Sequence, residues 1–211
     1  MFKTAFGKPT WPRALMLATL LCAATAEAQE SAPSQIVEDT AGRLLEQIDA
    51  RRAEFQDNPE ALKSMVREEL FPLLDQEYSA RLILGRHGRG LPADKVSEFA
   101  EALSMILTDR YSTGLLRFRS KDQMLILPPN PNDNERLTRV RTRLQLENGG
   151  SAPVDYAFRK TEQGWRVFDV TVEGVSYVIT FRNQLGPKVA AEGIEKVTAD
   201  LRAGKIEVTE S

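Results

Sequence analysis

The sequence contains one cysteine and one histidine, and this scarcity excludes several kinds of catalytic and metal site. Cys22 lies in an N-terminal apolar segment that we expect to be removed, which leaves no thiol for a disulfide or a nucleophile. His87 stands between glycines and arginines, and no second histidine or cysteine could complete a metal site with it. We therefore expect no metal and no cofactor.

Catalytic motifs are also missing. The glycines at 85–90 do not have the G-x-G-x-x-G spacing of a dinucleotide site, and the pattern before them is helical. Nothing marks the turn that carries a hydrolase serine. Acidic pairs such as Glu68 and Glu69 fit a solvated helix face, so we expect that the protein is not an enzyme. A hydrolase that uses two carboxylates stays open as the weaker alternative.

The charge balance argues against nucleic acid as a partner. The chain has 28 basic and 30 acidic side chains, a net charge of −2. Nucleic-acid binding depends mainly on neutralising phosphates, which needs a basic surplus. Adhesion to an anionic lipid surface by charge alone is disfavoured for the same reason. Any contact with lipid would have to be apolar.

The first 28 residues have the pattern of a secretory signal peptide. Basic residues up to Arg13 precede a short apolar run at 14–21, and Ala26 and Ala28 suit the cleavage positions. The run is too short to span a bilayer. Leu21 stands where a lipobox has a small residue before the cysteine, which argues against a lipoprotein. We expect a single domain over 29–211, exported to a bacterial periplasm.

Apolar residues recur at the spacing of a helix from Gln35 to Gly114, and they alternate with polar residues, as in a strand, after Arg119. Pro59 and Pro92 suit the starts of helices, and Pro72 breaks one. We expect helices at 36–48, 59–71, 75–84, 92–111 and 194–201, and strands at 124–127, 137–147, 154–159 and 164–181, with a hairpin turn at 148–150. This order indicates an α+β fold, with N-terminal helices packed on a twisted antiparallel sheet of about four strands and a C-terminal helix.

Two features allow two interpretations each. One is a basic stripe on a predicted strand, formed by Arg139, Arg141 and Arg143. It is either the solvent-facing side of a sheet, which is the favoured interpretation, or a docking surface for acidic partners. The apolar run 175–181 continues past a half-buried strand, as a two-sided core or as the lining of a cavity that holds an apolar ligand. Composition slightly favours the core.

Three segments resemble one known family. They are 75–85 (DQEYSARLILG), 164–176 (GWRVFDVTVEGVS) and 182–184 (RNQ), and the likeness extends from Gln35 to Leu201. The sequence is similar to the MlaC, or toluene-tolerance, family of periplasmic phospholipid carriers in Gram-negative bacteria. It departs from the family pattern at 86–88, where aromatics are more usual.

The resemblance implies an NTF2-like or cystatin-like α+β carrier whose apolar cavity lies between the sheet and its helices. Phospholipid would be cargo rather than a cofactor, with its head group in water. The implied partners are an outer-membrane lipoprotein–porin complex and an inner-membrane ABC transporter with an MCE-domain subunit, between which a monomer shuttles lipid to maintain outer-membrane asymmetry. A protein-interaction module with a filled core stays the alternative.

Strand alternation and helical spacing select the side chains expected to line the cavity. The expected lining residues are Leu82, Phe99, Leu103, Ile106, Val140, Leu144, Tyr156, Phe158, Val170, Val172, Val175 and Tyr177.

A charge within such a cavity should expel lipid, because a buried carboxylate without a partner is costly. We expect Val172→Glu or Leu144→Glu to abolish lipid co-purification from a protein that still folds. Mass spectrometry of an organic extract measures this, and unchanged lipid would place the cavity elsewhere.

Overall fold

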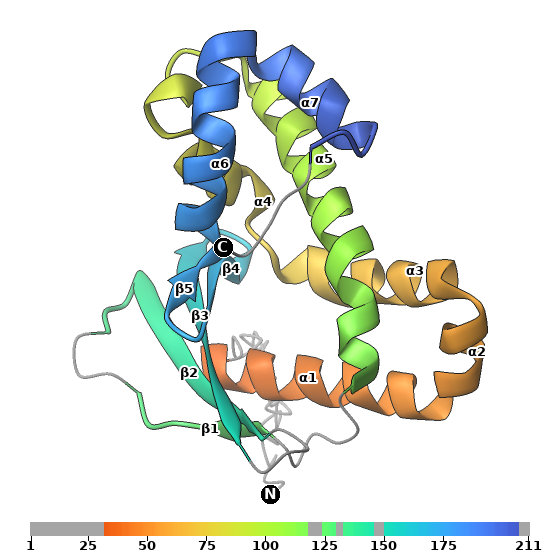
Figure 1. The fold of residues 1–211 in the computed structure, drawn as a ribbon. Coiled ribbons are helices and arrows are strands. Elements are labelled where there is room, and N and C mark those ends of the chain that lie inside the picture. Colours follow the sequence, from red (N-terminus) through yellow and green to blue (C-terminus); the bar gives the residue numbers. More distant parts are fainter. Residues whose placement is uncertain (1–31, 118–123, 130–132, 146–149, 207–211) are drawn as a thin grey trace, which may run out of the picture.

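The computed structural model describes residues 32–117, 124–129, 133–145 and 150–206 (Figure 1). The α-helices are α1 (Pro33–Ala50), α2 (Arg52–Asp57), α3 (Pro59–Leu70), α4 (Gln76–Leu84), α5 (Ala93–Tyr111), α6 (Tyr177–Glu192) and α7 (Ile194–Arg202). Short 3-10 turns are η1 (Phe71–Leu73), η2 (Gly85–Gly88) and η3 (Ser112–Arg117). The strands are β1 (Met124–Ile126), β2 (Leu137–Gln145), β3 (Ser151–Thr161), β4 (Gly164–Val172) and β5 (Val175–Ser176).

The strands form one antiparallel sheet in the order β1-β2-β3-β4-β5. Helix α1 lies across the inner face of this sheet, and α4 to α7 form a helical group beyond the β4 and β5 edge (Figure 1). The α+β class predicted from the sequence is confirmed, with five strands instead of about four. None of the described helices is both long enough and apolar enough to cross a membrane.

Three groups of buried side chains stabilise this arrangement. The helical core joins α4, α5, α6 and α7 and includes Phe99 and Leu185. A second core joins α1, α2 and α3 around Phe55 and Leu62. The sheet core lies between α1 and the inner face of the sheet, and Phe158 is its largest fully buried member. Burial of apolar surface at about 25 cal/mol per Å² is the main favourable contribution in each.

Several predicted boundaries are confirmed together with their local causes. The Asn58 side chain accepts a hydrogen bond from Ala61 N and caps α3, whose first residue is Pro59. Pro92 precedes α5. Helix α4 ends at Gly85, whose φ of +53° lies in a region that L side chains rarely adopt. The predicted signal peptide 1–28 and the turn residues 148–149 lie outside the described residues.

The predicted alternation along β4 is wrong after Val167, because a β-bulge interrupts it. Val167 pairs with Phe158 and Val170 pairs with Tyr156, so two β4 residues, Phe168 and Asp169, oppose the single residue Ala157. Since Tyr156 and Phe158 share a face of β3, the bulge places Val167 and Val170 on the same inner face. Uninterrupted alternation would place Val167 and Val170, which are three residues apart, on opposite faces of the strand.

The predicted strand to Phe181 is also wrong, because the chain turns into helix α6 at Tyr177. The turn before it contains Gly174, with φ of +85°. The Ser176 side chain caps α6 by accepting a hydrogen bond from Ile179 N at 3.1 Å. The β-branched Ile179 and Thr180 favour a strand by propensity, but the cap and tertiary packing outweigh that weak preference.

Truncation of Phe158 tests the sheet core. Phe158→Ala should lower the free energy of unfolding by about 3–5 kcal/mol, because a fully buried ring leaves a cavity. Leu125→Ala is the matched control, since Leu125 is 55% exposed and its loss should change stability by about 0.5 kcal/mol or less. Urea denaturation measures both, and equal losses would contradict this account of the core.

Candidate functional site

A cavity of about 150 Å³ lies between α4, α5, α6 and the bulged part of β4. Its wall is predominantly hydrocarbon, because each of the three helices contributes apolar side chains at helical spacing. The apolar lining residues are Leu74, Ala80, Ile83, Ala100, Leu103, Leu107, Val167, Phe168, Val170, Tyr177, Val178 and Phe181, where Tyr177 contributes its ring.

The polar side chains in the wall already have partners. The Ser104 hydroxyl donates to Gln76 Oε1 at 3.2 Å. Asp169 accepts two hydrogen bonds at the start of α6, from the Ser176 hydroxyl at 2.6 Å and from Val178 N at 3.0 Å. The positive end of the helix dipole also favours a carboxylate there. With its polar groups satisfied in this way, the wall offers an entering molecule mainly apolar contact.

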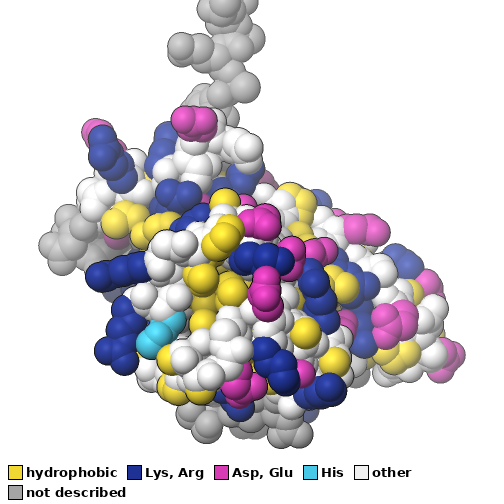
Figure 2. Space-filling view, turned by 90° about the horizontal axis from the view of Figure 1, so that it is seen from above, with side chains coloured by type: hydrophobic (Ala, Val, Ile, Leu, Met, Phe, Trp, Pro, Cys, Tyr) yellow, Lys and Arg dark blue, Asp and Glu magenta, His cyan; other side chains and the backbone are white. Residues whose placement is uncertain are grey.

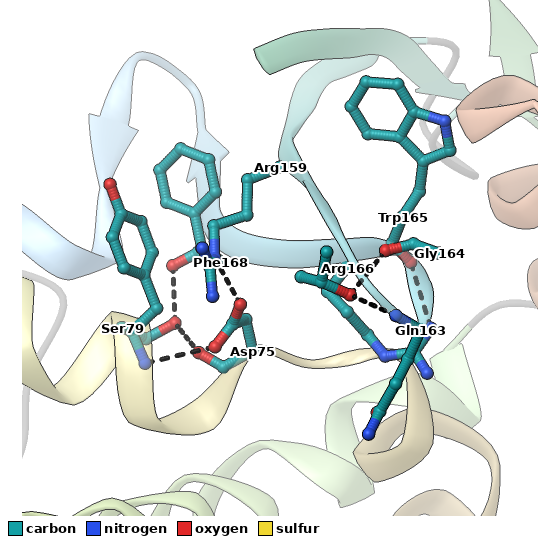
Figure 3. Close-up of polar contacts among 10 residues, drawn as sticks. Asp75, Ser79, Arg159, Gln163, Gly164, Trp165, Arg166 and Phe168 are labelled. Carbon is teal, nitrogen blue, oxygen red and sulfur yellow. Dashed lines mark hydrogen bonds and ion pairs between the residues drawn. The ribbon is translucent and has the colours of Figure 1, made fainter. Parts of the chain in front are cut away.

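The start of α4 is attached to the β4 bulge by a group of polar contacts, referred to below as the α4–β4 clasp (Figure 3). Asp75 caps α4 by accepting from Tyr78 N and forms an ion pair with Arg159 of β3. Asp75 N donates to Val167 O at 2.8 Å, and the Ser79 hydroxyl lies 2.7 Å from Phe168 O. The Arg159 guanidinium also stacks 4.4 Å above the Tyr78 ring. The clasp therefore sets the spacing of two cavity walls.

Three of the residues predicted to line a cavity do so here: Leu103, Val170 and Tyr177. The other three helical candidates belong to the helical core, where Phe99 is fully buried and Leu82 and Ile106 pack against it half-buried. These three occupy core positions in this conformation.

The remaining candidates belong to the sheet. Val140 and Phe158 are buried in the sheet core, and Tyr156 packs against them. Burial raises the pKa of the Tyr156 hydroxyl, partly offset by its hydrogen bond with Thr142, so the phenol stays neutral at ordinary pH. Leu144 and Val172 are half-buried, and Val175 is 42% exposed on β5. None of these six lines the cavity in this conformation.

Sequence reasoning missed several lining residues, among them Ala80, Ile83 and Phe181. The sequence contained a signal for Ala80 and Ile83, because they are three residues apart on a predicted helix and so share one face. Phe181 and Tyr177 are separated by four residues, a helical spacing that was overlooked because the segment was interpreted as a strand. Their rings stack with centroids 5.7 Å apart.

Within the described residues, no group of three or more His, Cys, Asp or Glu side chains could hold a metal ion. An α+β fold with a small, mostly apolar cavity between its helices and its sheet is typical of proteins that bind an apolar molecule. The family model described as "MlaC protein" matches residues 38–203. The chain therefore belongs to the MlaC family, and the resemblance stated from the sequence is confirmed.

Two curated relatives match over most of their length. The intermembrane phospholipid transport system binding protein MlaC of Haemophilus influenzae is 24% identical over 162 residues, 74% of this chain and 75% of the relative. The toluene tolerance protein ttg2D of Pseudomonas putida is 25% identical over 177 residues, 82% of this chain and 81% of the relative.

A solved structure supports the fold. The phospholipid-binding protein from Ralstonia solanacearum, solved in complex with a phospholipid, superposes with a TM-score of 0.73 at 18% identity. The match covers 83% of this chain and 98% of that one.

Removal of the Asp75 carboxylate tests the clasp. Asp75→Ala should cost about 1–2 kcal/mol of unfolding free energy, because it removes a helix cap and the partner of Arg159. Glu77→Ala, on the exposed side of α4, should change stability by about 0.5 kcal/mol or less. Thermal and urea unfolding measure both. A loss no larger than that of the control would show that the clasp contributes nothing.

Proposed function

We propose that the protein carries phospholipid through the periplasm, with its acyl chains in the cavity between α4, α5, α6 and β4. One observation carries this proposal: a mostly hydrocarbon wall with satisfied polar groups, in a member of the MlaC family. The names of both relatives and the phospholipid bound to the Ralstonia protein support it. The head group stays in water, because a buried phosphate without partners would be costly.

The energetics explain the need for a carrier. Two acyl chains have roughly 30 methylenes, so their transfer to water costs about 20–25 kcal/mol. Unaided passage between two membranes is therefore negligibly slow. The cavity must offset most of this cost without exceeding what a membrane or a receiving protein offers, since the lipid must also leave.

Two acyl chains do not fit the present cavity. A volume of about 150 Å³ matches cavities that hold one benzene-sized molecule. Lipid entry therefore requires α4 and α6 to move away from β4. Val167 and Val170 belong to both the cavity wall and the sheet core, so widening would extend the cavity along the inner face of the sheet. Val140, Tyr156 and Phe158 would then contact lipid, as would Leu144 and Val172 farther along that face.

Family membership supports a proposed export route and a proposed set of partners. Residues 1–28 act as a signal peptide, and the mature monomer exchanges lipid with an outer-membrane lipoprotein–porin complex and an inner-membrane ABC transporter with an MCE-domain subunit. This exchange maintains the lipid asymmetry of the outer membrane. We propose no catalytic activity.

Extraction of the purified mature protein, followed by mass spectrometry, tests the function directly. We expect phospholipid at a fixed ratio to protein and no turnover of ester or phosphodiester substrates. Protein without lipid would favour an interaction module with a filled core. Substrate turnover would favour a hydrolase.

Filling the cavity tests its location. Ala100→Phe and Leu103→Phe place larger side chains in a cavity of about 150 Å³ and should reduce bound phospholipid severalfold. Met105→Phe is the matched control on α5, because Met105 is 38% exposed and does not line the cavity. The readout is the lipid-to-protein ratio in folded protein. Equal ratios in all three variants would place the acyl chains elsewhere.

A further inference from the structure

A second, open groove lies between η2 and α6, and it has a volume of about 760 Å³. The groove is separate from the cavity, because different residues of α4 and α6 line the groove and the cavity. In α6, Tyr177, Val178 and Phe181 line the cavity, whereas Arg182, Asn183 and Gly186 line the groove. The proposed lipid cargo does not explain this groove.

The floor of the groove is made of small and apolar residues. Its apolar residues are Leu84, Gly85, Gly186, Pro187, Ala190 and Ala191. A Cβ atom added at Gly186 would lie 3.9 Å from the His87 ring, and one added at Gly85 would lie 3.8 Å from Arg182 Nε. Leu84 and Gly186 are buried, whereas Pro187, Ala190 and Ala191 are exposed and carry no long side chain, which leaves room for another polypeptide backbone to approach.

The groove also offers a backbone acceptor. Pro187 lies inside α6 and has no N–H, so the carbonyl of Asn183 lacks its usual intrahelical donor. Asn183 lines the groove and is exposed. A peptide N–H or an amide side chain of a bound polypeptide can donate to this oxygen.

The charge of the groove has one sign. Its charged lining residues are Arg86 and Arg182, next to His87, and no carboxylate lines it. Arg182 Nε donates to Leu82 O at 2.6 Å and Arg86 Nε donates to His87 Nε2 at 3.1 Å, so neither guanidinium is paired with an acid within the described residues. Arg202, by contrast, pairs with Glu101. Figure 2 shows the histidine next to Lys and Arg side chains.

We propose that this groove binds an acidic segment of a partner protein. Carboxylates of the segment pair with Arg86 and Arg182, and its backbone lies on the floor of glycine and alanine. The protein as a whole has a net charge of −2, yet the described lining of the groove has two arginines and no acid to neutralise them. Charge complementarity therefore favours a negatively charged partner segment. The volume of about 760 Å³ and the floor of small residues leave room for a polypeptide segment, and its N–H groups can use the Asn183 carbonyl. The proposal does not depend on lipid binding.

A peptide titration of the full mature protein tests the groove. The probe is a short acetylated and amidated helical peptide of alanine and glutamate, compared with the same peptide carrying glutamine instead. NMR shifts of the Gly186 and Ala190 amides report binding at low ionic strength. We expect the affinity for the glutamate peptide to fall on the order of tenfold in the Arg86→Ser/Arg182→Ser variant and to fall with added salt. Arg202→Ser should bind as the wild type does.

A steric variant covers the case in which the loss of Arg182 disturbs the fold. Ala190→Trp should block the floor and weaken binding without changing charge, whereas Ala203→Trp, at the exposed end of α7, should not.

Four results would overturn the proposal: equal affinity for the glutamine peptide, equal loss in the two control variants, binding only to phosphatidylglycerol vesicles, or binding only to inorganic phosphate. Each of these leaves the lipid content of the purified protein unaffected, so failure here is distinct from failure of the carrier function.

Discussion

The attachment of α4 and α6 to the bulge in β4 is the constraint on which the site depends. Asp75 caps α4 and pairs with Arg159 of β3, and Asp169 of β4 accepts hydrogen bonds from Ser176 and Val178 at the start of α6, so two carboxylates position two cavity walls. A helix cap such as Asp75 contributes about 1 kcal/mol locally. Because the bulge also places Val167 and Val170 on one face, a single irregularity in β4 both holds the helices and supplies the apolar wall.

A carrier needs a cavity that is neither filled nor permanently open. An open hydrocarbon cavity of lipid size would expose apolar surface to water and destabilise the empty protein. In this structure the cavity is small and the clasp is made of polar contacts, which can break and reform in water at modest net cost. Under the proposed function, the strength of the clasp sets how much of the lipid's binding free energy is used to widen the cavity.

Most of the fold could be predicted from the sequence, because the helix boundaries have local causes such as Asn58, Pro59 and Gly85. The errors have tertiary causes. The bulge at Phe168 and Asp169 depends on partners in β3 and α4, which no strand periodicity contains. Helix α6 begins at a β-branched run, and only the contacts of Ser176 and Asp169 show that it is helical. The predicted lining was correspondingly partial, since only Leu103, Val170 and Tyr177 lie in the cavity wall.

Helix α6 has one face in the cavity and another in the groove. In the proposed carrier, a shift of this helix that admits lipid also changes the shape of the groove, so lipid and a docked protein segment compete or cooperate for one helix position. Thermodynamic linkage then requires reciprocity: the factor by which a docked protein changes cargo affinity equals the factor by which cargo changes docking. A shuttle built in this way could distinguish its loaded from its empty form without any additional sensor.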